Sequence, residues 1–104
     1  MPKSYVRWQM NSQFTPVDPE ERGKLWLSML DMVKADLKKG AFTDWGVCYD
    51  VSAGYALSEL SEQDLYEVML KWMPYVDFDV KPVLDVDQVI ESIKKVAAAT
   101  KKRV

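Results

Sequence analysis

The stretch from Ser61 to Asp85 constrains the fold most, because a helical pattern changes to a strand pattern inside one short segment. Ser61 is a good helix N-cap, and Asp64 stands three residues later at the spacing of a capping box. Apolar residues then recur at helical spacing: Leu65, Val68, Met69, Trp72 and Met73, with Tyr66 and Leu70 beside them. The pattern predicts a helix that buries more than one of its sides.

Pro74 disfavours helical geometry at the residue before it and is expected to end this helix. From Asp77 the period changes to two, which predicts a strand. One face of this strand carries Phe78, Val80, Pro82 and Leu84, and the other carries Asp77, Asp79, Lys81, Val83 and Asp85. Because Pro82 cannot donate to a strand ladder, an edge position is expected. Asp85 is a candidate N-cap for a last helix over residues 86–98, with Gln88 at its third position.

The N-terminal part predicts a strand and then a long helix. Residues 4–11 alternate, with Val6, Trp8 and Met10 on one face. A helix start follows at Asp18, where Pro19 occupies the first helical position, and Gly40 is suited to a left-handed cap at the other end. Its apolar stripe consists of Leu25, Trp26, Met29, Leu30, Val33 and Leu37. Gly23 lies inside this helix, and close packing is the expected reason for a glycine there.

The remaining elements are short. Residues 45–51 and 55–60 are predicted strands joined by a hairpin turn at 52–54, with faces that the pattern leaves open. The last helix has a stripe of Val89, Ile90, Ile93, Val96 and Ala97, and residues 100–104 are expected to form a frayed basic tail.

The order strand, helix, strand, strand, helix, strand is that of the ferredoxin-like α+β fold, here with an extra C-terminal helix. We therefore predict one domain over residues 1–104, with an antiparallel sheet in the order 4-1-3-2. Both long helices are expected on one face of the sheet, and the other face is expected to be bare.

The block Trp72-x-Pro74-x-x-x-Phe78-x-Val80-x-Pro82-Val83-Leu84-Asp85, together with the tryptophan of the first strand, resembles an uncharacterised family of small prokaryotic proteins. That family is similar to the dimeric α/β-barrel superfamily, in which two ferredoxin-like sheets face each other. The resemblance implies a homodimer formed through the bare sheet face. It implies no particular function, since the superfamily includes oxygenases, isomerases, haem-degrading proteins and ligand-sensing domains. The absence of histidine separates this chain from the histidine-bearing members.

Five polar residues are candidates for a ligand site on the bare face: Arg7, Gln9, Asp50, Asp79 and Lys81. The first and fourth strands are neighbours in this fold, so Arg7 is expected to meet Asp79 across the ladder. If a second subunit covers the face, these residues line an enclosed cavity, where an unpaired charge points to function.

Composition excludes several kinds of chemistry. With one cysteine and no histidine, no transition-metal site and no cofactor are expected, and Cys48 is interpreted as a small buried apolar residue. A formal net charge of −2 argues against a dedicated nucleic-acid or membrane partner. A lone thiol and the lack of a signal-peptide core favour the cytoplasm.

Three hypotheses for function remain open. The first is the binding of a small, partly apolar, anionic molecule between the sheets of a homodimer, with Arg7 as its charge partner. The second is a cofactor-independent isomerase or small oxygenase that uses Asp50 or Glu59 as its base. The third is a structural or protein-interaction module without a ligand.

Overall fold

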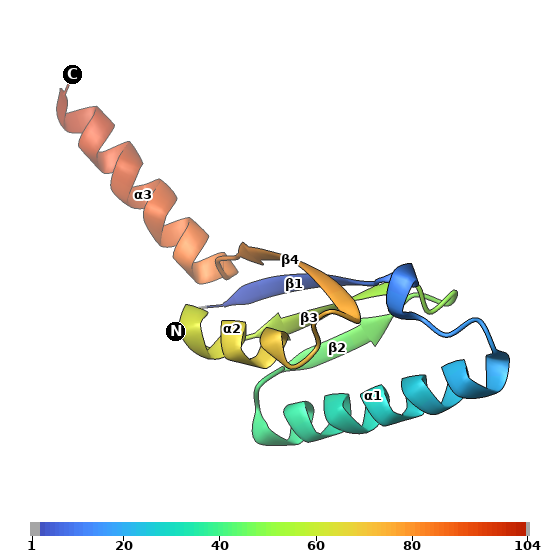
Figure 1. The fold of residues 1–104 in the computed structure, drawn as a ribbon. Coiled ribbons are helices and arrows are strands. Elements are labelled where there is room, and N and C mark those ends of the chain that lie inside the picture. Colours follow the sequence, from blue (N-terminus) through green and yellow to red (C-terminus); the bar gives the residue numbers. More distant parts are fainter. Residues whose placement is uncertain (1–2, 104) are drawn as a thin grey trace.

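The computed structural model describes the backbone of residues 3–103 and the side chains of residues 3–100. The elements in chain order are β1 (Ser4–Met10), a short 3-10 helix η1 (Ser12–Phe14), α1 (Pro19–Lys39), β2 (Asp44–Val47), β3 (Ala53–Ser58), α2 (Glu62–Leu70), β4 (Val76–Pro82) and α3 (Val86–Arg103). The four strands form one antiparallel sheet in the order β2-β3-β1-β4. The predicted α+β ferredoxin-like order and the edge position of β4 are confirmed. Helices α1 and α2 lie on the same side of the sheet, and α3 leaves the body at one end (Figure 1).

The ends of α1 form as the sequence predicts. The Glu21 amide donates to the Asp18 carboxylate at 3.0 Å, and Gly40 takes the left-handed conformation at φ 82°. Its N–H donates back to the last turn, so the free backbone groups at both ends of the helix find partners. These local contacts explain why α1 begins and ends where it does, independently of what the helix packs against.

Side chains also cap the N-terminal ends of α2 and α3. Ser61 Oγ accepts a hydrogen bond from the Asp64 amide at 3.2 Å. At α3 the capping box is complete: the Gln88 amide donates to Asp85 Oδ1, and the Asp85 amide donates to Gln88 Oε1, both at 2.9 Å. Although α3 was expected to end near residue 98, it runs to Arg103, so residues 100–103 continue the helix; Val104 lies outside the described residues.

The core lies between the sheet and the two helices that cover it. Val6 and Ala56 from the two central strands are each 1 % exposed, and they pack with Leu65 and Val68 of α2. A second cluster joins Trp8, Val33, Trp72 and Val76. Alternation along β1 and β4 therefore assigned the helix-facing side correctly, except at Leu84, which follows β4 and is 62 % exposed.

Several expectations were wrong. Tyr66 and Leu70 are exposed at 54 % and 46 %, so α2 buries a single side. The hairpin turn covers residues 48–52 rather than 52–54, and β2 ends at Val47. The Val51 amide closes the turn on the Cys48 carbonyl, with Val51 at φ 62°, while Asp50 accepts hydrogen bonds from Ser52. Such local side-chain bonds compete with a strand ladder, which is why the strand ends early.

Candidate functional site

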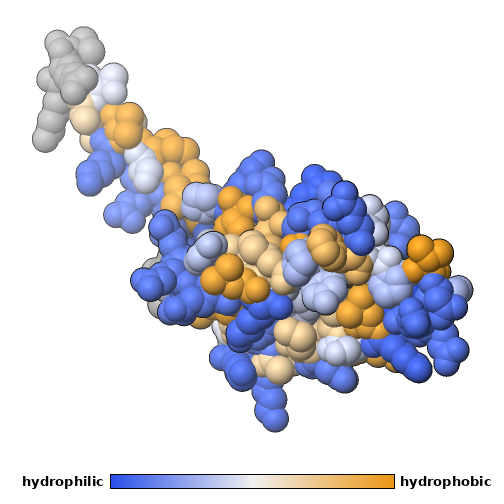
Figure 2. Space-filling model, viewed as in Figure 1, coloured by the Kyte–Doolittle hydropathy of each residue, from blue (hydrophilic) through white to orange (hydrophobic). Residues whose placement is uncertain are grey.

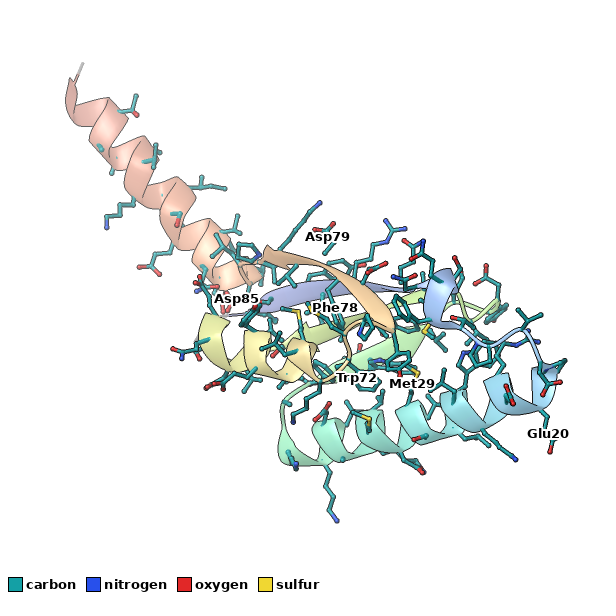
Figure 3. The ribbon with its side chains drawn as sticks, in the orientation of Figure 1. Glu20, Met29, Trp72, Phe78, Asp79 and Asp85 are labelled. Carbon is teal, nitrogen blue, oxygen red and sulfur yellow. The ribbon has the colours of Figure 1, made fainter. Side chains whose placement is uncertain are left out.

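Four of the five predicted site residues share the open face of the sheet. Arg7 and Gln9 of β1 alternate with the buried Val6 and Trp8, and register places them directly across from Asp79 and Asp77 of β4. Lys81 lies across from Tyr5 on the same face. Figure 3 shows Asp79 on the side of the sheet away from α1. Asp50 is not part of this group, because it lies in the exposed turn between β2 and β3.

Arg7 has no carboxylate within ion-pair distance among the described residues. Asp79 lies across the ladder as predicted, but its carboxylate pairs instead with Lys81 of its own strand at 3.9 Å, with both side chains mostly exposed. An exposed pair of this kind contributes little to stability. The guanidinium of Arg7 is therefore left for another partner.

A shallow recess of about 380 Å³ surrounds Arg7, and its lining includes Tyr5, Tyr55, Gly46 and Cys48. The rings of Tyr5 and Tyr55 stack with centroids 6.5 Å apart and planes 5° from parallel. The Tyr55 hydroxyl donates to Asp44 at 2.8 Å, and this hydrogen bond raises the pKa of Tyr55 above its ordinary value of 10.0. The recess thus combines one free cation with two aromatic rings.

The carboxylates proposed as bases are poorly placed for that role. Asp50 and Glu59 are both exposed. Hydrogen bonds from the Ser52 hydroxyl at 2.8 Å and the Ser52 amide at 3.1 Å hold the pKa of Asp50 below its ordinary value of 3.8. A general base needs the opposite, a carboxyl whose pKa is raised toward neutrality. Neither residue supports the enzyme hypothesis.

Cys48 is a free thiol on the surface, so its interpretation as a buried apolar residue was wrong. Within the described part of the chain, no three histidine, cysteine or acidic side chains gather as a metal site would require. No helix in residues 3–103 has the length and apolarity needed to cross a membrane.

A second cavity lies on the other side of the sheet, between α1 and the strands. It measures about 410 Å³, and we call it the helix–sheet cavity. The strands contribute Val6, Trp8, Met10, Trp45, Val47, Ala56, Val76 and Phe78; α1 contributes Gly23, Trp26, Leu27, Met29, Leu30 and Val33; and Phe42, Val51 and Trp72 complete the lining. Figure 3 shows Met29 and Trp72 in the space between α1 and the sheet. All of these side chains are apolar or aromatic.

Three of the four tryptophans that line this cavity carry an indole N–H that is covered by protein and unpaired within the described chain. The indole nitrogens of Trp8, Trp26 and Trp72 are buried, and none has a hydrogen-bond partner among the described residues. They come from β1, α1 and the turn after α2. A buried N–H without an acceptor costs about 1–3 kcal/mol, so three around one space are unusual. The cavity surface itself is almost wholly apolar, and the three donors lie within the side chains that form its wall.

One wall of the helix–sheet cavity is incomplete. Leu27 and Leu30 of α1 line it yet are 66 % and 41 % exposed, so they border an opening to solvent. Next to them the guanidinium carbon of Arg22 lies 5.4 Å above the centre of the Trp26 ring. A Cβ atom built on Gly23 would contact nothing within 4 Å, so the expected close packing at this glycine is wrong. Because Gly23 has no side chain, the cavity is wider here than it would be with a larger residue.

The apolar patterns of the sequence did not predict this cavity, although its tryptophans were a signal. Trp8, Trp26 and Trp72 were assigned to apolar stripes, but tryptophan carries a donor that a dry core seldom satisfies. Asp36 follows Val33 at helical spacing on the side of α1 that faces the sheet. It is 5 % exposed, and its Oδ2 has no hydrogen-bond partner among the described residues. Leu37, which was predicted to be part of the apolar stripe, is 39 % exposed. Asp36 does not line the cavity, so the tryptophans are the signal for it that the apolar patterns contained.

A family model described as a domain of unknown function, DUF3303, matches residues 5–97. The chain belongs to the DUF3303 family. This agrees with the resemblance to an uncharacterised family of small single-domain proteins, and it assigns no activity. None of the curated proteins matches the sequence significantly. The matched range of the DUF3303 domain includes every residue of both sites described above.

Proposed function

We propose that this DUF3303 protein binds a small molecule in the helix–sheet cavity, and that the ligand is mostly apolar with one or more hydrogen-bond acceptors. The observation that carries the proposal is the set of three buried, unpaired indole nitrogens on one apolar cavity. These nitrogens are covered in the unliganded protein, so an acceptor on the ligand would reach them through a rotation of the indole side chains that line the cavity. The sequence alone suggested binding at the bare sheet face; the cavity under α1 gives stronger support for a ligand of this class.

Two physical arguments support this assignment. A volume of about 410 Å³ lies within the range of about 300–1,000 Å³ typical of small-molecule sites. Such sites are usually apolar with a few polar groups that orient the ligand, and here the indoles are the polar groups. Filling the cavity would also remove apolar surface from water along α1, which contributes about 25 cal/mol per Å².

A matched pair of probes tests the proposal. 2-Acetylnaphthalene and 2-isopropylnaphthalene have nearly the same shape, but only the first carries a carbonyl acceptor. We expect calorimetry to show binding of both, with the ketone about fivefold tighter because a new hydrogen bond is worth about 1 kcal/mol. Equal affinities would refute the role of the indoles, and no binding of either probe would refute the site.

Substitutions of cavity residues test whether the probe binds in the helix–sheet cavity. Gly23→Leu places a side chain in the cavity and should abolish binding, whereas Gly23→Ala makes the same backbone change without filling the space. Trp26→Phe should remove most of the preference for the ketone. Trp45→Phe is its control, because Trp45 lines the same cavity but is not among the tryptophans with a buried, unpaired nitrogen. Identical behaviour of the two phenylalanine variants would exclude an indole donor at Trp26.

A second candidate is the binding of a small anion on the open sheet face, enclosed by a second copy of the chain. The guanidinium of Arg7, which lines the same recess as Tyr5 and Tyr55 and has no ion-pair partner among the described residues, favours it. 2-Naphthoate is a suitable probe, since the recess offers one cation and stacked rings. If 2-naphthoate binds on the open sheet face, its binding should be lost in Arg7→Gln and kept in Gly23→Leu. If it binds in the helix–sheet cavity instead, its binding should be kept in Arg7→Gln and lost in Gly23→Leu. Binding that survives Arg7→Gln removes this candidate.

A further inference from the structure

The helix–sheet cavity differs between its two ends. Toward the C-terminus of α1 its wall includes Val33 and Phe42, each only 5 % exposed. Near the start of α1 the wall is half-buried, and we call this part the outer end: Met10, Gly23, Trp26 and Val51. The hairpin that contains Val51 and the start of α1 lie at the same end of the molecule (Figure 1). The Met10 amide donates to the carbonyl of Ser52 in that hairpin at 2.8 Å, which brings β1 to the same place. A ligand in this cavity would have one end enclosed by apolar protein and the other end near water.

Arg22 brings a positive charge to the outer end. Its guanidinium carbon lies 5.4 Å from the centre of the Trp26 ring, and Trp26 is part of the cavity wall. Its Nη1 donates to the Val17 carbonyl at 3.4 Å, which is a long and weak hydrogen bond. The other N–H groups of the guanidinium have no partner among the described residues and are not buried. The guanidinium is therefore held beside the cavity wall with most of its donors available.

The acidic side chains near the outer end have other partners. Asp18, one turn before Arg22, accepts a hydrogen bond from the Glu21 amide at 3.0 Å and so caps α1. Asp50 in the hairpin accepts hydrogen bonds from the hydroxyl of Ser52 at 2.8 Å and from its amide at 3.1 Å. Within the described part of the chain, no carboxylate lies within ion-pair distance of Arg22. Its charge is left for a group from outside the chain.

We infer that the ligand of the helix–sheet cavity is a small apolar carboxylic acid, and that Arg22 binds its carboxylate at the outer end. This inference rests on the binding function proposed above. The apolar body of the ligand has to lie inward, because none of the described residues that line the cavity is charged. A carboxylate placed among them would be buried without a partner, at a large cost in free energy.

The chemistry of Arg22 favours a carboxylate over other anions. The planar guanidinium offers parallel N–H donors that match the two oxygens of a carboxylate. One guanidinium balances the single charge of a carboxylate, whereas a phosphate group brings nearly two charges. The Trp26 ring already restricts the guanidinium, so less side-chain freedom is lost when the carboxylate binds.

A pair of probes that differ in one charge tests the inference. 3-(2-Naphthyl)propanoate and 3-(2-naphthyl)propanamide have the same apolar body and nearly the same shape, and only the first is an anion at neutral pH. We expect calorimetry at low salt to show that the carboxylate binds about tenfold more tightly, because charge-assisted hydrogen bonds are stronger than neutral ones. The preference should shrink in about 0.5 M salt, since the outer end is near water. Equal affinities at low salt would overturn the inference and leave the proposed cavity standing.

Substitution of Arg22 tests whether it is the source of the preference. Arg22→Gln should lower the affinity for the carboxylate about tenfold and change that for the amide by less than about twofold. Lys24→Gln is the matched control and should keep the preference. Lys24 is a cation of the same helix that pairs with Glu20 at 3.7 Å, and Figure 3 shows Glu20 on the side of α1 away from the sheet.

The remaining outcomes separate this inference from the proposed function. If Arg22→Gln weakens both probes equally, Arg22 only supports the Trp26 ring, and the inference is wrong. If the preference is lost in Arg7→Gln and kept in Arg22→Gln, the carboxylate binds on the open sheet face, and the inference is again wrong. If neither probe binds the wild-type protein, the proposed function fails and the inference fails with it.

Discussion

Helices α1 and α2 cover the same face of one sheet, but they close it to very different degrees. The nine-residue α2 buries Leu65 and Val68 against Val6 and Ala56, and none of its own residues lines the helix–sheet cavity. The 21-residue α1 buries only Val33 and Asp36, and a cavity of about 410 Å³ remains beneath it. The longer helix therefore makes the poorer contact.

The difference shows that well-formed helix ends do not imply a well-packed helix. Both helices have side-chain N-caps, and α1 also has a glycine cap at its C-terminus. Capping depends on residues within one turn, while packing depends on volume across the layer. The half under α2 has the character of a structural core, and the half under α1 contains the cavity proposed to bind a ligand. Four predictions test this division.

The largest expected effect separates the two halves directly. Leu65 is 2 % exposed, so Leu65→Ala should lower the free energy of unfolding by about 2–5 kcal/mol. Leu30→Ala removes the same atoms from α1, but Leu30 is 41 % exposed beside the opening and should cost less than about 1 kcal/mol. Chemical denaturation measures both. Equal losses would mean that α1 is as closely packed as α2, and the division would fail.

The buried carboxylate of α1 gives the next largest effect. Asp36 is 5 % exposed with an unpartnered Oδ2, so Asp36→Leu should raise the free energy of unfolding by about 1–3 kcal/mol. Asp31→Leu is the control, because Asp31 is exposed on the same helix and its replacement should change stability by less than about 0.5 kcal/mol. A destabilised Asp36→Leu protein would show that the carboxylate has a favourable partner in solution.

Glycine substitutions sharpen the contrast between loose and close packing. Gly23→Ala should stabilise the protein by about 0.5–1 kcal/mol, because the added methyl group meets no atom and alanine favours a helix. Gly46→Ala should destabilise it, since the new Cβ would collide with the Tyr55 ring. Thermal unfolding of the two variants distinguishes these cases. A loss of stability in Gly23→Ala would place closely packed atoms where the cavity is described.

Features set by neighbouring residues were predictable from the sequence. The caps at Asp18, Ser61 and Asp85, the alternation of β1 and the strand order all follow from local chemistry and from the order of elements. The open-face positions of Arg7 and Asp79 followed from the same alternation. Their ion pair did not, because Lys81 lies two residues from Asp79 and competes for the carboxylate.

Features that depend on distances between layers were not predictable. The stripe of α1 indicates which side faces the sheet, but it does not indicate how far away the sheet lies, so the helix–sheet cavity had no clear signature. The apolar stripe predicted for α3 lies on the helix, but its residues are exposed in the structure (Figure 2). Periodicity thus identifies an apolar face and does not show whether another element covers it.

The smallest expected change in stability is on the open face of the sheet, which serves as the reference for the two halves beneath α1 and α2. Tyr55 faces away from the helices while its neighbour Ala56 is buried beneath them. Its hydrogen bond to Asp44 raises the folded-state pKa of Tyr55, so the contribution to stability is present below about pH 10.0 and is lost as pH rises through the raised value. Absorbance titration should show one late-titrating tyrosine that is missing from Tyr55→Phe and retained in the exposed control Tyr66→Phe.

At neutral pH Tyr55→Phe should barely change the free energy of unfolding, since an exposed hydrogen bond competes with water. A loss comparable to that of Leu65→Ala would show that the open face is as tightly packed as the core under α2.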